Sequence, residues 1–109
     1  MWIFTTTGFV SAVYKEGALQ VRARDKQSLE SLEAKTGSAI KHTPLADYPY
    51  RLSTTISDFA NWAFEQALAI DYGNFKSEVA DVRGYKFAKP LNKVWSAMHE
   101  VEDEGARVR

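Results

Sequence analysis

The chain has 109 residues, of which 45% are hydrophobic and 13% aromatic, so it holds enough apolar material to pack one domain. Its 14 basic and 14 acidic residues give no net charge, which argues against a dedicated DNA-coating protein. Cysteine is absent, which excludes disulfide bonds, a thiolate nucleophile and cysteine-ligated zinc.

The hydropathy along the chain predicts neither a signal peptide nor a membrane-spanning helix. Residues 1–10 have no basic segment followed by an apolar core. No apolar stretch approaches the roughly 20 residues that cross a bilayer. We therefore expect a cytoplasmic protein without a membrane partner.

The chain opens with residues that favour strands. Residues 2–15 are rich in β-branched and aromatic side chains and are broken by Gly8, which predicts one long strand with a bulge or bend there. Glu16 and Gly17 predict a tight hairpin turn. Apolar and polar residues then alternate over 19–24, which predicts a second strand with one buried face.

A helix is predicted after this hairpin. Asp25 is suited to cap its first turn, and Gly37 is suited to the left-handed conformation that ends a helix. Leu29 and Leu32 form its apolar stripe.

The same order of elements then recurs. Residues 39–43 and 50–54 predict two strands, and Thr55 or Ser57 is expected to cap a helix that runs to about Ile70. Six apolar residues are expected to bury this helix: Phe59, Trp62, Ala63, Phe64, Ala67 and Ile70.

The C-terminal third predicts shorter helices. Asn74 is a cap for a helix that carries Phe75, Val79 and Val82, and Gly84 interrupts it. Pro90 fits the first turn of a last helix. An apolar stripe follows this last helix and consists of Leu91, Val94, Trp95, Met98 and Val101.

Together these elements predict an α+β fold. Two β-β-α units are expected to form a four-stranded antiparallel sheet with both helices on one face. The C-terminal helices would cover a sheet edge or extend the helical layer. We expect a single domain over residues 1–103 and a frayed tail over 104–109.

Catalytic and metal-binding motifs are missing from the sequence, so no cofactor and no metal are expected. His42 near Asp47 is one candidate for a general base, and the alternative is a half-exposed strand residue beside a turn. His99 is interpreted as a surface residue of the last helix.

Tyr48, Tyr50 and Arg51 form the first candidate binding region. The two tyrosines are expected on one sheet face beside Pro49, and tyrosine and arginine are common binding anchors. The alternative is that they fasten the strand to the helix behind it.

A basic segment with interleaved aromatic residues forms the second candidate region. Basic and aromatic residues together suit contact with phosphates and stacking on bases, and they equally suit an acidic protein. The alternative is a solvated loop balanced by the acidic residues 100–104. The residues proposed for contact are Arg83, Lys86, Phe87 and Lys89.

The chain resembles a group of small uncharacterised proteins from actinobacteria and their phages. The resemblance lies in Met-Trp-Ile-Phe-Thr-Thr-Thr-Gly-Phe (1–9), Val-Arg-Ala-Arg (21–24), Ala-Asp-Tyr-Pro-Tyr-Arg (46–51), Ile-Asp-Tyr-Gly-Asn-Phe-Lys-Ser-Glu-Val (70–79) and Val-Trp-Ser-Ala-Met (94–98). It implies a genomic context, with a regulatory or host-directed role, and no mechanism.

Three functional hypotheses follow. The first is a non-enzymatic interaction module with a protein partner. The second is nucleic-acid binding through residues 83–93, and the third is a small enzyme that uses His42 and Asp47. An open sheet edge would also permit a homodimer.

Overall fold

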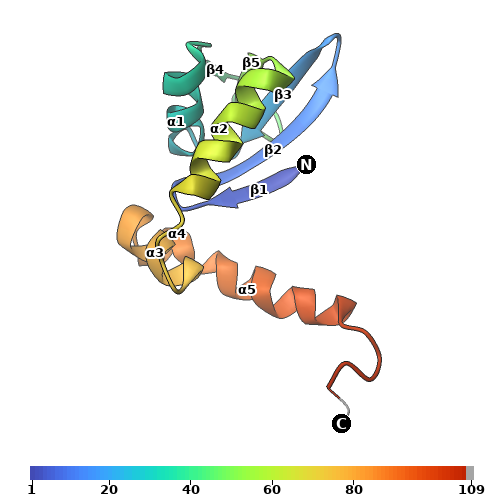
Figure 1. The fold of residues 1–109 in the computed structure, drawn as a ribbon. Coiled ribbons are helices and arrows are strands. Elements are labelled where there is room, and N and C mark those ends of the chain that lie inside the picture. The colour runs from blue at the N-terminus through green and yellow to red at the C-terminus, as the bar shows by residue number, and fades with distance from the viewer. Residues whose placement is uncertain (108–109) are drawn as a thin grey trace. The chain divides into compact units, whose positions relative to one another are not determined.

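The computed structural model describes residues 1–107 and has an antiparallel sheet and several helices (Figure 1). The chain divides into two compact units, Met1–Tyr72 and Gly73–Arg109. The α+β class is therefore confirmed, and a single domain over 1–103 stays a prediction. Within the described residues, no helix is both long enough and apolar enough to span a membrane.

The first unit contains a sheet of five strands. Every neighbouring pair is antiparallel, and the order across the sheet is β1-β2-β3-β5-β4. The strands are β1 (Trp2–Thr5), β2 (Gly8–Lys15), β3 (Ala18–Ala23), β4 (Lys41–His42) and β5 (Tyr50–Thr54).

The prediction of one long bent strand over 2–15 is wrong, because these residues form the hairpin β1–β2. The Thr5 hydroxyl accepts a hydrogen bond from the backbone N–H of Thr7 at 3.3 Å, inside the turn. Gly8 begins β2 at a point where the helix α1 (Gln27–Thr36) lies against the sheet. The sheet therefore has five strands instead of the four predicted.

The predicted strand over 39–43 is reduced to the two residues of β4. The backbone N–H of Ile40 donates to Oε2 of Glu33 on α1 at 2.8 Å, so this segment is held by the helix. The ladder with β5 begins only at Lys41.

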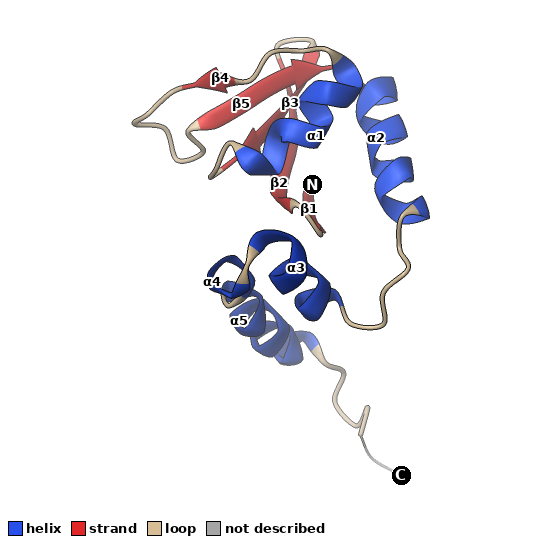
Figure 2. Cartoon of the chain, turned by 90° about the vertical axis from the view of Figure 1, so that its left-hand side faces the viewer, coloured by secondary structure: helices blue, strands red, loops and turns tan. Residues whose placement is uncertain are grey.

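Two helices pack on one face of the sheet, as predicted (Figure 2). The helix α1 ends at Gly37, whose φ of 74° is left-handed. The helix α2 (Ile56–Leu68) begins after Thr55, whose hydroxyl accepts from the backbone N–H of Asp58 at 3.1 Å. The choice between Thr55 and Ser57 is thereby settled for Thr55.

The core of the first unit lies between the sheet and these two helices. Strand residues meet Leu29 and Leu32 of α1, as predicted, and Phe59 and Trp62 of α2. Ala63 also packs against this core, whereas the other predicted residues of the apolar face, Phe64, Ala67 and Ile70, are exposed. A helix turns by about 200° over two residues, so Phe64 cannot share the face of Trp62.

The second unit is helical. It contains α3 (Phe75–Arg83), α4 (Tyr85–Ala88), α5 (Pro90–Ala97) and a 3₁₀ helix (Met98–Val101). Oδ1 of Asn74 accepts from the N–H of Ser77 at 2.9 Å, which confirms the predicted cap. The apolar stripe of the last helix is largely solvent-exposed, with Trp95 61% accessible.

Residues 102–107 follow the 3₁₀ helix and include the start of the predicted tail over 104–109. Glu102 accepts hydrogen bonds from Arg107 and from His99, and these contacts, the one with Arg107 first, lower the pKa of Glu102. Residues 108–109 of the predicted tail lie outside the described residues.

Candidate binding surfaces of the sheet

Tyr48 is a packing residue of the first unit. It is only 6% exposed, and the guanidinium groups of Arg22 and Arg24 lie over its ring at 4.6 Å and 4.4 Å from the centroid. Both distances fall within the range of a cation–π contact. Tyr48 is therefore covered by two arginines of the sheet and presents little surface to a partner.

The loop that carries Tyr48 is fixed to the sheet by further contacts. Nη1 of Arg24 donates to Oδ1 of Asp47 at 2.9 Å and to the Asp47 carbonyl oxygen at 2.8 Å. The hydrogen bond to the carboxylate is the main cause that raises the pKa of Arg24. Nε of Arg51 donates to the carbonyl oxygen of Tyr48 at 3.3 Å.

Tyr50 lies on the opposite side of the sheet from Tyr48. Tyr50 pairs with the buried Ala23 and packs against the core, so it belongs to the helix-covered face. The prediction that both tyrosines share one face is wrong, because β5 begins only at Tyr50 and strand alternation does not extend back through Pro49.

The predicted pair of His42 and Asp47 is also not formed. The His42 ring stacks on Tyr50, with the centroids 4.6 Å apart and the planes at 6°. The carboxylate of Asp47 is held by Arg24 instead. No group of three or more His, Asp or Glu side chains in residues 1–107 is arranged to hold a metal ion.

The strand register places a row of side chains across the face of the sheet that α1 and α2 leave uncovered. Val10, Val21 and Leu52 are buried on the helix side, so their strand neighbours point to the other side. The register joins one such neighbour from each strand in the order Trp2, Ser11, Arg22, Arg51 and Lys41. We call this side the open face.

The charged strand residues on the open face all have the same sign. The five strands contain neither Asp nor Glu. Alternation puts all of their Lys and Arg residues, namely Lys15, Arg22, Lys41 and Arg51, on the open face. We call Arg22, Arg51 and Lys41 the cationic row. A neutral chain therefore carries a local concentration of positive charge.

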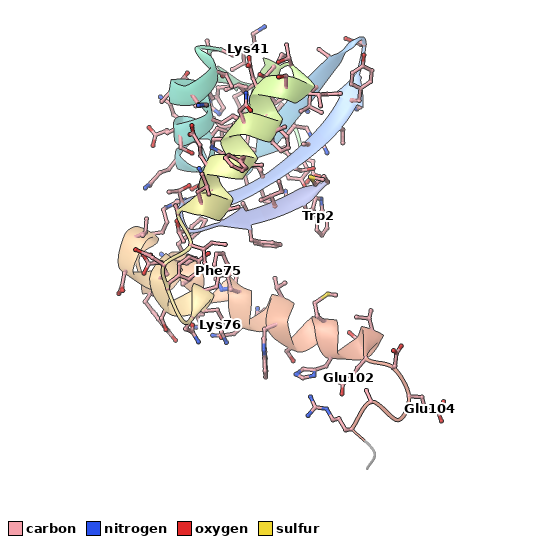
Figure 3. The ribbon with its side chains drawn as sticks, in the orientation of Figure 1. Trp2, Lys41, Phe75, Lys76, Glu102 and Glu104 are labelled. Carbon is pink, nitrogen blue, oxygen red and sulfur yellow. The ribbon has the colours of Figure 1, made fainter. Side chains whose placement is uncertain are left out.

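Aromatic residues of β1 and β2 flank the cationic row. The rings of Phe4 and Phe9 stack with centroids 4.6 Å apart, and Trp2 meets Phe9 edge-on at 5.6 Å. Trp2 is 68% exposed. Figure 3 marks Trp2 and Lys41, which belong to the two edge strands of the sheet.

The strand β1 is a sheet edge with free backbone groups. Met1 and Ala12 exchange two backbone hydrogen bonds, each of 2.8 Å. Bonded pairs alternate in an antiparallel ladder, so the next ones are Ile3 with Val10 and Thr5 with Gly8. The backbone N–H and C=O groups of Trp2 and Phe4 therefore point outward.

A pocket of about 250 Å³ lies beside this edge. Both of its walls belong to the first unit: β1 and its turn form one, and the C-terminal half of α2 with the residues after it forms the other. Its apolar lining includes the side chains of Ile3, Ala63, Ala67 and Ile70. We call it the edge pocket.

No family model, no curated protein and no solved structure matches the chain. The interpretation of these surfaces therefore comes from their geometry and chemistry.

The second candidate region, with Arg83, Lys86, Phe87 and Lys89, lies in the second unit, and only part of it is exposed basic surface. The guanidinium of Arg83 lies 3.7 Å from the centroid of the half-buried Phe87, so this ring is engaged within the unit. Lys86 and Lys89 are exposed. Lys89 also contributes to a pocket of about 300 Å³ between α3, α4 and α5.

Sequence reasoning identified Arg51 and missed the rest of the open face. The sequence predicts strand positions for Trp2, Arg22 and Lys41 and no binding role for them. The signal that was present is the absence of acidic residues from every predicted strand, together with strand alternation. The register that aligns these residues across the sheet was not readable from the sequence.

Proposed function

We propose that this chain is a non-enzymatic protein-binding module that accepts an extended segment of another protein as an additional strand on β1. The observation that carries the proposal is the free edge of β1 beside the edge pocket. Strand addition to an exposed sheet edge is a common mode of peptide recognition.

The backbone of β1 supplies the affinity in this scheme. Trp2 and Phe4 each offer an outward N–H and C=O, and no hydrogen bond from outside the β1–β2 ladder occupies these groups within residues 1–107. An incoming strand would pair with both residues, which is the arrangement that an unprotected edge favours.

The edge pocket supplies the specificity. Every second side chain of an added strand points toward the helix-covered side, where the pocket lies. Its volume of about 250 Å³ is below the roughly 300–1,000 Å³ of pockets for drug-sized ligands, and it suits one or two apolar side chains. The expected partner is an extended segment with large apolar residues at alternate positions.

Selection from a displayed library of random peptides, followed by affinity measurement on the enriched peptides, tests this proposal. The substitution Ala67→Leu fills the edge pocket and keeps a good helix former on α2. It is expected to weaken binding about tenfold, equivalent to about 1.4 kcal/mol. Ala60→Leu, at an exposed position of α2 outside the pocket, is the matched control and should leave binding unchanged.

A second pair of variants separates the backbone from the side chain. Phe4→Pro removes an outward N–H and leaves the bonded pairs of the ladder in place, whereas Phe4→Val keeps that N–H and removes the ring. We expect Phe4→Pro to bind more weakly than Phe4→Val. Equal affinity of both, with no effect of Ala67→Leu, contradicts strand addition at this edge.

The same edge would also allow two copies of the chain to pair. Light scattering on the purified protein distinguishes these arrangements. A dimer that Phe4→Pro disrupts would assign the edge to self-association, whereas a monomer leaves it free for another protein.

A further inference from the structure

The open face of the sheet is a second surface whose chemistry differs from that of the edge pocket. We propose that it binds single-stranded nucleic acid, with the cationic row on the phosphates and Trp2 stacked on a base. This inference goes beyond the proposed function, because it uses the other side of the sheet and a different class of ligand.

The first argument is charge complementarity. Four cations of the strands lie on the open face and no strand carries an acidic residue. The loop before β5 carries one carboxylate, that of Asp47, and this carboxylate is paired with Arg24. Uncompensated cations on one face attract a polyanion, and each neutralised phosphate releases counterions.

The second argument is that two members of the cationic row, Arg51 and Lys41, have free donors. The guanidinium of Arg22 is fixed in place by Oγ of Ser11 at 2.9 Å and by the Tyr48 ring, and its Nε is buried, so Arg22 contributes positive charge and no free donor from Nε. Arg51 uses only Nε, toward the carbonyl oxygen of Tyr48, so its two terminal nitrogens stay available in the described structure. Lys41 is exposed and forms no ion pair within these residues.

The third argument is the position of the aromatic side chains. Four strand spacings of about 4.8 Å separate Trp2 from Lys41, so the line of five residues from Trp2 through the cationic row to Lys41 is about 20 Å long and spans several nucleotides. Trp2 stands at one end of it, 68% exposed, with Phe9 supporting its ring edge-on. Base stacking on such a ring is a main source of affinity in single-strand binders.

These aromatic residues favour nucleic acid over an acidic protein segment. The carboxylates of an acidic segment would pair with the cationic row, but they would not stack on the exposed Trp2 ring. A nucleic acid uses the cations and the ring together. The variants below therefore separate charge from stacking.

The test is fluorescence anisotropy of the full chain with labelled single strands of about 16 thymidines or uridines, the upper end of known site sizes. Affinity is measured between about 50 and 200 mM salt, and the logarithm of the binding constant should fall with a slope of about −0.7 for each phosphate contacted. Arg51→Gln and Lys41→Gln should each make this slope shallower by about 0.7. Lys26→Gln, an exposed lysine at the start of α1 on the covered side, should leave it unchanged.

Trp2→Ala tests the stacking role. It should weaken binding about tenfold at every salt concentration without changing the slope, and Trp2→Phe should restore most of the affinity. Circular dichroism confirms that each variant is folded. Ala67→Leu should bind the oligonucleotide with unchanged affinity. The nucleic-acid proposal and the proposal of peptide binding at the edge pocket can therefore be rejected independently.

Two results would overturn the proposal. One is the absence of binding to any single strand at low salt. The other is an unchanged affinity of Trp2→Ala together with equally strong competition by polyglutamate, which would assign the face to acidic proteins.

Discussion

Single residues decide how the helices meet the sheet. Gly8 lies under α1, where a Cβ atom would come within 2.0 Å of Oγ and 2.8 Å of Cα of Ser28. The Ser28 hydroxyl accepts from the N–H of Phe9 at 3.2 Å and donates to Asp25, so it cannot move without breaking these bonds. Glycine at position 8 is thus required by contact between two elements.

We therefore predict that Gly8→Ala destabilises the fold by at least about 2 kcal/mol, since overpacking a close contact forces the backbone apart. The control is Gly73→Ala, because nothing lies within 4 Å of a Cβ at that position. Urea denaturation measures both. A loss below 0.5 kcal/mol (about the scatter of surface substitutions) for Gly8→Ala would contradict the packing described.

Tyr48 shows why a residue type alone does not identify a contact. Tyrosine is favoured at interfaces, yet here its ring is used inside the unit, beneath Arg22 and Arg24. Which of the two roles applies depends on what lies above the ring. That information belongs to the tertiary structure.

At the scale of elements, α2 is a helix with one narrow buried face. Phe59 and Trp62 enter the core, and Nε1 of Trp62 donates to Oγ of Ser31 on α1 at 3.0 Å. Lys35 of α1 forms an ion pair with Glu65 of α2. The opposite side of α2 is apolar and exposed at Ile56, Phe64 and Leu68.

This division predicts two different mutational outcomes. Trp62→Ala removes a fully buried side chain and is expected to cost about 3–5 kcal/mol of folding free energy. Phe64→Gln should change it by no more than about 0.5 kcal/mol. Thermal and urea denaturation of both variants check this, and a large loss for Phe64→Gln would show that this ring is buried in solution.

The elements were predictable where local rules apply. Thr55, Asn74 and Gly37 mark helix ends because caps depend on a few neighbouring backbone groups, and the sequence predicts each of them alone or as one of two choices. The predicted cap Asp25 is wrong, because Lys26 is the N-cap of α1 and Asp25 accepts from the Ser28 hydroxyl instead. The hairpin at Gly8 was missed, because the pattern within 2–15 fits one strand as well as two. Gly8 also lies against Ser28 of α1, and a local pattern does not reveal such a contact between elements.

The binding surfaces were less predictable for the same reason. The cationic row joins residues of three strands, and only the register of the sheet brings Arg22, Arg51 and Lys41 into line. The edge pocket needs both β1 and α2. A sequence reveals the composition of such surfaces and not their assembly.

At the scale of the whole molecule, the two units differ in how much they bury. The principal core cluster lies entirely within Met1–Tyr72. In the second unit, Val79 and Ala88 are the buried residues among those described. Chains of fewer than about 40 residues seldom fold without additional support, and this unit spans residues 73–109.

We therefore predict that residues 1–72 unfold cooperatively when produced alone, and that residues 73–109 alone do not. Thermal denaturation followed by circular dichroism tests both fragments. Loss of the cooperative transition from the 1–72 fragment would contradict this division and would support a single domain over 1–103.

Amide hydrogen exchange tests the central claim, recognition at the edge of β1, most directly. The exchange rates of the Trp2 and Phe4 amides are compared by NMR in the free protein and in its complex with an enriched peptide. The account predicts fast exchange in the free protein and at least tenfold slower exchange in the complex, because both N–H groups then donate to the added strand. Unchanged exchange at Trp2 and Phe4 in a saturated complex would contradict it.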